Sequence, residues 1–129
     1  MEARSKHFRK RDAILDCIRS TKVHPSAEWV FSQLKPQIPD LSLGTVYRNL
    51  ALFRQQGEIM SVGTVQGVER FDGNTIPHVH FICTGCGTVL DLEQMEIPAE
   101  LSITAAGCVG GKVHECHLAF TGTCEPCMH

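Results

Sequence analysis

The sequence has no apolar run long enough to span a membrane. Residues 1–11 are charged and lack the apolar core of a secretory signal, so we expect a cytoplasmic protein. A hydrophobic content of 43% with 20% charged residues argues against a disordered chain. The 129 residues are enough for one ordinary domain or for two small ones.

Basic residues are almost absent after residue 72. Residues 73–129 contain one Lys or Arg against six Asp or Glu, whereas residues 1–72 contain 11 against eight. The formal net charges are therefore −5 and +3. This asymmetry is expected if only the first part binds a polyanion, and chance variation in surface charge is the alternative.

The first part of the chain predicts three helices followed by a hairpin. Apolar side chains recur at helical spacing in residues 9–20, 26–34 and 43–56. Ser26 and Ser42 are the expected N-caps of the second and third helices. Residues 59–65 and 68–71 alternate like strands around a Gln66-Gly67 turn.

This order is that of a winged helix-turn-helix, whose third helix enters the major groove of DNA. Its exposed side is expected to carry Thr45, Tyr47, Arg48 and Asn49. Arg and Asn make bidentate contacts to base edges, whereas Tyr and Thr commonly hold phosphates. A small helical bundle with an appended hairpin is the alternative.

The second part predicts a small domain that needs a cross-link. Residues 1–73 form the expected DNA-binding domain, residues 74–78 a hinge, and residues 79–129 a small α/β domain, so the fold class is α+β. Strands are predicted at 79–82 and 88–92, a short helix at 98–106, and one or two strands within 112–123. This part is rich in Gly and poor in aromatic residues, so its apolar core is small.

Two C-x-x-C pairs supply the cross-link. Cys83 and Cys86 form the first pair, and Cys124 and Cys127 form the second after 37 intervening residues. A tight turn aims both sulfurs of a pair at one ion, with Gly85 providing backbone freedom, so four thiolates predict a closed structural zinc site. A redox dithiol pair is the alternative, although neither pair clearly begins a helix that would lower a thiol pKa.

A second set of metal-binding side chains surrounds the hinge. His78 and His80 have the spacing that places two imidazoles on one face of a strand. Asp72 ends the hairpin, Asp91 lies on the strand after the first cysteine pair, and His24 precedes the second helix. Nitrogen and oxygen donors suit ferrous iron, manganese or zinc. Surface or capping roles for these residues are the alternative.

Four motifs carry a resemblance to a known family. They are HPSAE at 24–28, SLGTVYRNL at 42–50, ERFD at 69–72 and HVHFICTGCG at 78–87. In order and spacing, from about residue 11 to 127, they resemble the ferric uptake regulator (Fur) family, most closely its peroxide-responsive (PerR) branch.

The resemblance implies a homodimeric winged-helix repressor that binds operator DNA through residues including Arg11. It also implies structural zinc and a regulatory ferrous iron or manganese ion. The regulatory ligands it implies are His24, Asp72, His78, His80 and Asp91. Within this branch, His24 and His78 are the expected oxidation-sensitive ligands.

Some positions differ from the iron-sensing members of the family. Those members usually carry Glu at the position of Asp72, and Pro77 and Val79 replace ligands of their second sensory site. Cys116 replaces a further histidine, as a buried thiol or as a redox group. Cys108, His114, Cys116 and His117 form an auxiliary site or are simply scattered core and surface residues.

The resulting hypothesis is a metal-dependent repressor that senses hydrogen peroxide by metal-catalysed oxidation of a ligand histidine. An iron- or zinc-responsive repressor of the same fold is the nearest alternative. A zinc-ribbon interaction module is an alternative of another class, but it does not explain the third helix. We expect no enzyme, because the sequence lacks a clear general base beside an open zinc site.

Overall fold

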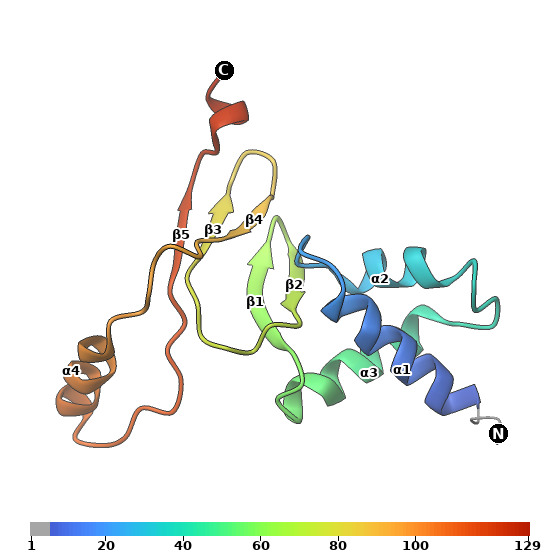
Figure 1. Ribbon diagram of the computed structural model, residues 1–129, viewed down its shortest axis with the longest axis horizontal. Coiled ribbons are helices and arrows are strands. Elements are labelled where there is room, and N and C mark those ends of the chain that lie inside the picture. The colour runs from blue at the N-terminus through green and yellow to red at the C-terminus, as the bar shows by residue number, and fades with distance from the viewer. Residues whose placement is uncertain (1–5) are drawn as a thin grey trace. The chain divides into compact units, whose positions relative to one another are not determined.

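The computed structural model describes residues 6–129, which form two compact units (Figure 1). The units are Met1–Thr75 and Ile76–His129, and their boundary lies inside the expected 74–78 hinge. The first five residues of the charged N-terminal segment lie outside the described residues. None of the helices described is long and apolar enough to cross a membrane.

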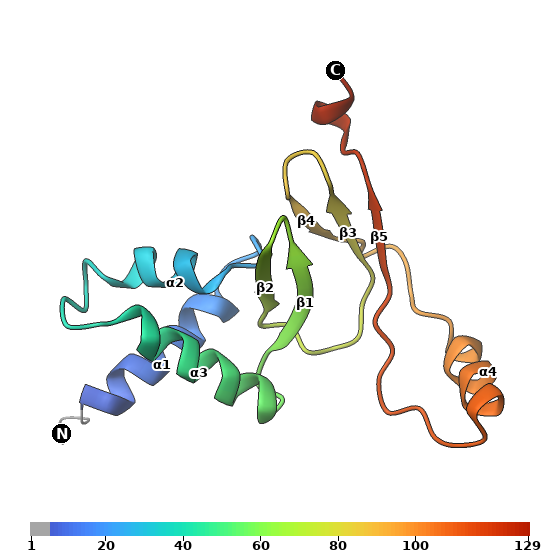
Figure 2. The ribbon, with the colours of Figure 1, turned by 180° about the vertical axis from the view of Figure 1, so that it is seen from behind.

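The first unit contains three helices and a two-stranded wing. Its elements are α1 (Lys6–Arg19), α2 (Ala27–Leu34), α3 (Leu43–Gln55), β1 (Met60–Val65) and β2 (Val68–Asp72). The strands β1 and β2 pair in antiparallel fashion (Figure 2). This order confirms the predicted winged helix-turn-helix.

The three helices enclose the main apolar core of this unit. Side chains at helical spacing turn inward from each helix and are 1% exposed or less; they are Ile14, Ile18, Val30, Val46, Leu50 and Phe53. Burying a large aliphatic or aromatic side chain stabilises a fold by about 1.5–3 kcal/mol. The core therefore fixes α3 against α1 and α2.

Caps and a turn define where these elements begin and end. The Ser26 hydroxyl accepts a hydrogen bond from the Trp29 amide at 3.1 Å, and Ser42 accepts one from Thr45 at 3.1 Å. Gln66 and Gly67 have φ of 52° and 81°, as a tight hairpin turn requires. These three sequence predictions are confirmed.

The second unit contains a three-stranded sheet in the order β4-β3-β5. Its elements are β3 (His80–Cys83), β4 (Val89–Asp91), α4 (Ala99–Val109), β5 (Ala119–Gly122) and the 3-10 helix η1 (Glu125–Met128). Strand β3 pairs antiparallel with β4 and parallel with β5. The sheet therefore brings the C-terminal cysteines to the end of β3, where the first cysteine pair begins.

One of the strands predicted within 112–123 is present as β5, and the predicted short helix is present as α4. Residues 112–118 alternate in sequence but form no strand, because the residues paired with β3 begin at Ala119, with only the Leu118 carbonyl before it accepting a hydrogen bond from the His80 amide. Helix α4 buries none of its side chains within one chain, and Ile103 and Val109 are 71% and 73% exposed. Apolar side chains exposed in this way are typical of a surface that pairs with another chain.

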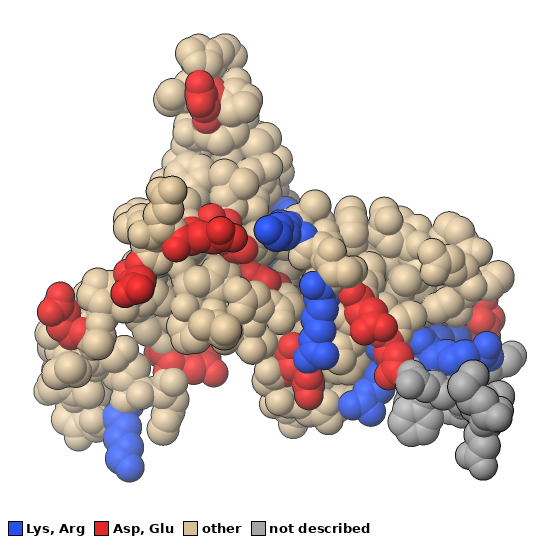
Figure 3. Space-filling model, in the orientation of Figure 1, with Lys and Arg blue, Asp and Glu red and all other residues tan. Residues whose placement is uncertain are grey.

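The two units differ in the charge of their surfaces. On the face shown in Figure 3, blue side chains gather over the helices of the first unit, whereas the second unit shows mostly red ones. The charge asymmetry in the sequence is thus also present at the surface. The first unit is the one suited to a polyanion such as DNA.

Candidate metal centres and DNA-binding surface

The four cysteines of the two C-x-x-C pairs come together in the second unit. Their four sulfur atoms, from Cys83, Cys86, Cys124 and Cys127, all lie within 4.8 Å of one another. The Cys86 and Cys124 sulfurs are 3.7 Å apart. A tetrahedron with Zn–S bonds of about 2.3 Å has sulfurs separated by about 3.8 Å, so the cluster fits one zinc ion.

Glycines shape the first cysteine turn, but not as the sequence suggested. Gly87, not Gly85, has the left-handed backbone, with a φ of 76°. A Cβ atom added at Gly85 would lie 3.2 Å from the Cys127 sulfur. The expected role of Gly85 is therefore wrong, because this residue supplies space for the second cysteine pair rather than backbone freedom.

The second cysteine pair does begin a helix, contrary to the sequence expectation. Cys124 is the N-cap of η1, which has only four residues and carries Pro126 near its start. The Cys127 backbone N–H of this short helix lowers the pKa of the Cys124 thiol, but the Cys83 and Cys86 sulfurs and burial outweigh it, so the pKa is raised overall. The structure therefore gives no support to a redox dithiol at this pair.

The cluster holds its protons unevenly, as four crowded thiols must. Backbone N–H groups of Cys124 and Cys86 donate to the Cys83 sulfur and lower its pKa to about 6. Hydrogen bonding among the neighbouring sulfurs raises the pKa of Cys127 to about 12. A divalent cation would displace the remaining protons, since the thiolate is the form that binds metal.

In the first unit, His24 and Asp72 lie next to each other. The His24 Nε2 atom is 3.3 Å from Asp72 Oδ2, and the two side chains are 3% and 10% exposed. The other carboxylate oxygen, Oδ1, accepts a hydrogen bond from the Asn74 amide at 2.8 Å. The Asn74 contact orients the carboxylate, so its Oδ2 atom faces the imidazole.

In the second unit, three further side chains form a compact group. Asp91 Oδ1 lies 2.9 Å from His78 Nε2 and 3.2 Å from His80 Nε2. The register of the sheet explains this, because His80 on β3 is paired directly with Asp91 on β4. A partly buried carboxylate shared by two imidazoles is a donor set for a divalent transition metal.

The sequence predicted a wider set of DNA-contacting residues than the structure exposes. Tyr47 and Arg48 are exposed on α3, and the Arg48 guanidinium donates to the Thr45 hydroxyl at 3.0 Å. The Tyr47 hydroxyl donates to the carboxylate of Glu28 on α2, a residue that sequence reasoning missed. This contact lowers the pKa of Glu28 and raises that of Tyr47.

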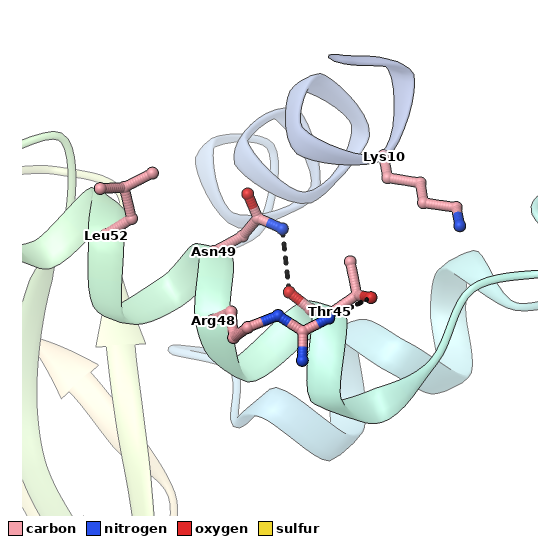
Figure 4. A pocket seen from close by; sticks show the side chains of 5 residues that line it. All are labelled: Lys10, Thr45, Arg48, Asn49 and Leu52. Carbon is pink, nitrogen blue, oxygen red and sulfur yellow. Dashed lines mark hydrogen bonds between the residues drawn. The ribbon is translucent and has the colours of Figure 1, made fainter. Parts of the chain in front are cut away.

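The expectation that Asn49 lies on the exposed side of α3 is wrong. Asn49 is 6% exposed, because it follows Val46 by three residues and shares its inward face. Its side-chain amide donates to the Thr45 carbonyl oxygen at 2.9 Å (Figure 4). The Asn49 amide is thus hydrogen-bonded within α3.

A pocket lies between α1 and α3 in the first unit. It is lined by Lys10, Thr45, Arg48, Asn49 and Leu52 (Figure 4). Sequence reasoning missed Lys10, although the basic run at 9–11 was a signal for it. Its ammonium group lies 3.3 Å from the Asp40 carboxylate.

Arg11, the DNA contact that was expected near the N-terminus, is half-buried. Its guanidinium carbon lies 5.6 Å from the centre of the Phe53 ring, and its Nη2 atom lies 3.5 Å from Gln56 Oε1. Arg11 thus packs α1 against the C-terminal end of α3.

Among residues 9–129, whose side chains the structure describes, the remaining cysteines and histidines do not form a third metal cluster. His117 pairs with Glu115 at 3.1 Å, and both side chains are exposed. Cys108 is exposed and Cys116 is partly buried. In this part of the chain, scattered residues rather than an auxiliary site are present.

Comparison with known proteins identifies the family. Residues 2–121 match the ferric uptake regulator family, which is nearly the whole chain. The chain belongs to this family. Fur family members are dimeric DNA-binding repressors, not enzymes, and they combine structural zinc with regulatory iron or manganese. This member of the family has donor groups suited to both kinds of metal.

Curated relatives of this Fur family chain include two peroxide regulators. The chain is 33% identical over 118 residues to the "Peroxide operon regulator" of Bacillus subtilis (strain 168), covering 92% of this chain and 81% of the relative. It is 30% identical over 119 residues to the "Peroxide-responsive repressor PerR" of Staphylococcus aureus (strain USA300), covering 92% and 80% respectively. The resemblance to the peroxide-responsive branch is thereby confirmed.

A solved structure shares the fold of this Fur family chain. The Campylobacter jejuni peroxide stress regulator superposes with a TM-score of 0.78 at 24% identity, covering 95% of this chain and 91% of that one. The family match and the two curated relatives, rather than this structure, show that the chain is a metal-dependent transcriptional repressor. The alternative of a zinc-ribbon interaction module is wrong, because the family match includes the winged helix.

Proposed function

We propose that this repressor senses hydrogen peroxide in the cytoplasm through oxidation of a histidine that binds its regulatory metal. The observation that carries the proposal is that each unit by itself groups nitrogen and oxygen donors. His24 lies against Asp72 in the first unit, and His78 and His80 lie against Asp91 in the second. The peroxide regulators among the relatives support this choice over an iron- or zinc-responsive repressor.

The donor set suits ferrous iron or manganese, because imidazole and carboxylate ligands favour these ions over thiophilic metals. Bound ferrous iron would activate hydrogen peroxide by one-electron chemistry, and the two electrons that reduce the peroxide would in the end come from the imidazole. In the overall reaction, one peroxide oxygen adds to a ring carbon of His24 or His78 and the other leaves as water. An oxidised imidazole is a poorer ligand, so the metal is lost and repression ends.

The ring of His78 is already oriented for metal binding. Its Nδ1 atom lies 2.6 Å from the Ile76 carbonyl oxygen, which can only accept a hydrogen bond. The Ile76 contact places a ring proton on Nδ1. The Nε2 atom faces the Asp91 carboxylate at 2.9 Å as a donor, and it would give up that proton and offer its lone pair when an ion binds there. The histidine pair and Asp91 thus form a preorganised half of the regulatory site.

Ligands from both units explain how metal controls DNA binding. An ion bound by both donor sets favours the one arrangement of the units in which all five ligands reach it. If that arrangement places the two α3 helices of a homodimer on successive operator half-sites, metal shifts the population toward the DNA-binding state. Thr45, Tyr47 and Arg48 are the proposed operator contacts of each α3.

The four cysteines have a separate, structural role in this proposal. Cys83, Cys86, Cys124 and Cys127 hold a zinc ion that ties the end of β3 to the C-terminal residues. The binding energy of such an ion is folding energy for a domain with a small core. The zinc has no open coordination position, so it does not take part in peroxide sensing.

Operator binding measured by electrophoretic mobility shift tests the proposal. The wild-type protein should bind operator DNA with Mn²⁺ and lose binding when Mn²⁺ is chelated, while retaining zinc. Brief low-dose peroxide should abolish binding by the ferrous form and spare the manganese form. A ferrous form that keeps binding DNA after peroxide would indicate an iron- or zinc-responsive repressor instead.

Two histidine variants sharpen this experiment. His24→Ala should lose metal-dependent operator binding and keep its zinc. His117→Ala removes an exposed imidazole outside both donor sets and should behave like the wild type. Full metal-dependent binding by His24→Ala would exclude His24 as a required ligand.

A further inference from the structure

One arginine of the wing reaches the loop that carries His24. Arg70 lies on β2, and its Nη2 atom donates to the Val23 carbonyl oxygen at 2.6 Å. Its Nε atom donates to the His24 carbonyl oxygen. The next residue on the strand, Phe71, donates its amide hydrogen to the Pro25 carbonyl oxygen at 2.9 Å. Three consecutive carbonyl groups of the loop are thus bound to two consecutive residues of β2.

The backbone of His24 is in a conformation that needs such support. His24 has a φ of 55°, in the left-handed region that residues other than glycine adopt uncommonly. Residues persist there when their surroundings hold them in place. The carbonyl of His24 itself is bound by Arg70, so the arginine acts directly on the strained residue.

The same strand carries the partner of the His24 imidazole. Residues two apart on a strand point to the same side, so Arg70 and Asp72 both face the loop. The arginine binds the backbone of His24, and the Asp72 carboxylate lies 3.3 Å from its imidazole. Backbone and side chain of His24 are therefore both positioned from β2.

Arginine is well suited to this task. Its planar guanidinium presents several N–H donors in a fixed geometry, so it can bind two carbonyl oxygens at once, whereas a lysine ammonium is a single point charge. Burial lowers the pKa of Arg70. The half-buried guanidinium has hydrogen bonds from two different nitrogens to compensate for lost water.

We propose that Arg70 is a positioning residue of the regulatory metal site. It holds residues 23–25 on β2 so that His24 is presented with Asp72 before metal arrives. This inference rests on the proposed function of His24 and Asp72 as metal ligands. Arg70 does not itself bind the metal, because it has no lone pair to donate.

Three variants of the full-length, zinc-loaded protein test this role. Arg70→Met removes the guanidinium and keeps much of the apolar stem. Arg70→Lys keeps the positive charge but loses the planar group with several N–H donors. Arg54→Met is the matched control, since Arg54 forms an exposed ion pair with Glu69, the neighbour of Arg70 on β2. Exposed pairs of this kind contribute little to stability.

Two readouts are needed, one of metal affinity and one of the metal-free loop. Mn²⁺ titration should show affinity about 10- to 100-fold weaker in Arg70→Met, as for other residues that orient metal ligands. Hydrogen exchange of the metal-free protein should be faster in the peptide covering residues 21–26. Arg70→Lys should fall between Arg70→Met and the wild type, and Arg54→Met should match the wild type in both readouts.

The results separate this inference from the proposed function. Wild-type Mn²⁺ affinity in Arg70→Met, or weaker affinity with unchanged exchange of the loop, would overturn the positioning role. Equal Mn²⁺ affinity in the wild type and His24→Ala would overturn the metal site itself. If zinc content or Trp29 fluorescence shows that Arg70→Met is misfolded, Arg70→Lys decides the outcome. Mn²⁺ affinity and loop hydrogen exchange equal to those of the wild type would then overturn the role. Weaker Mn²⁺ affinity together with faster loop exchange would support it.

Discussion

A single methyl group at residue 73 should disturb the first unit. Gly73 directly follows Asp72, and a Cβ atom added to it would lie 2.9 Å from the Arg19 Cα and 3.1 Å from the Arg19 amide nitrogen. Real Cβ atoms essentially never approach backbone atoms to 2.9 Å, so the end of α1 or the end of β2 must move. Gly73→Ala should therefore weaken the fold.

The magnitude follows from the kind of contact. Forcing extra atoms into a packed site typically costs about 1–3 kcal/mol. A domain of this size loses about 1–2 kcal/mol of its unfolding free energy per molar urea, so the urea midpoint should fall by roughly 1 M. Because Asp72 moves with Gly73, Mn²⁺ affinity should fall as well.

Gly44→Ala is the matched control in the same unit. An added Cβ there meets the end of the flexible Arg48 side chain at 3.3 Å and the Ser42 hydroxyl at an ordinary 4.0 Å. Alanine inside a helix is favoured over glycine by about 0.5–1 kcal/mol, so this variant should be as stable as the wild type or more stable.

Trp29 makes the measurement specific to the first unit. It is the only tryptophan in the chain, and it packs against the apolar core of that unit. Urea unfolding followed by its fluorescence therefore reports this unit alone. A Gly73→Ala midpoint equal to or above that of the wild type, or an equal loss in Gly44→Ala, would refute the packing argument.

Three further predictions concern the caps, the tyrosine and the zinc. Ser26→Ala removes the N-cap of α2 and should lower the unfolding free energy by about 1 kcal/mol in the Trp29 fluorescence assay; an unchanged value would show that the cap is dispensable. Tyr47 is the only tyrosine, so absorbance at alkaline pH should show its ionisation above the ordinary pKa of 10.0 in the wild type and a return toward it in Glu28→Gln. A raised phenol pKa means that the contact stabilises the fold below pH 10 and is lost as the pH rises through the raised value; identical titrations of the two proteins would contradict it. Chelating zinc should remove the circular dichroism of the second unit while leaving the Trp29 unfolding midpoint in place, and retention of the full spectrum without zinc would contradict a structural role.

Local chemistry made much of the fold predictable from the sequence. Ser26 and Ser42 were identified as caps because their hydroxyls satisfy amides that every helix leaves open. The Gln66-Gly67 turn followed from the backbone that a two-residue hairpin loop requires. The four cysteines were found by spacing, which is fixed by the size of the ion they fit.

Tertiary contacts account for what the sequence did not reveal. The burial of Asn49 depends on how α3 is rotated against α1. The sequence does not mark where the buried face of a helix ends and its exposed face begins. The contact of Tyr47 with Glu28 joins residues 19 apart in sequence. Arg70 binds carbonyl groups 46 and 47 residues away. A pattern of side chains cannot predict this contact, because its acceptors are backbone groups.

The second unit shows the same limit in its strands. Residues 112–118 alternate like a strand, yet pairing with β3 starts only at Ala119. Alternation identifies a segment that can form a strand, but only a neighbouring edge in register supplies its hydrogen bonds. Gly85 was assigned the wrong role for a similar reason, because the nearby Cys127 sulfur comes from the far end of the chain.

The most direct test of peroxide sensing is peptide mass spectrometry of the iron-loaded and manganese-loaded proteins after brief, low-dose hydrogen peroxide. The account predicts one added oxygen on the peptides that contain His24 or His78, only in the iron-loaded protein and together with loss of operator binding. Unmodified peptides in an iron-loaded protein whose metal-dependent operator binding is intact would contradict peroxide sensing.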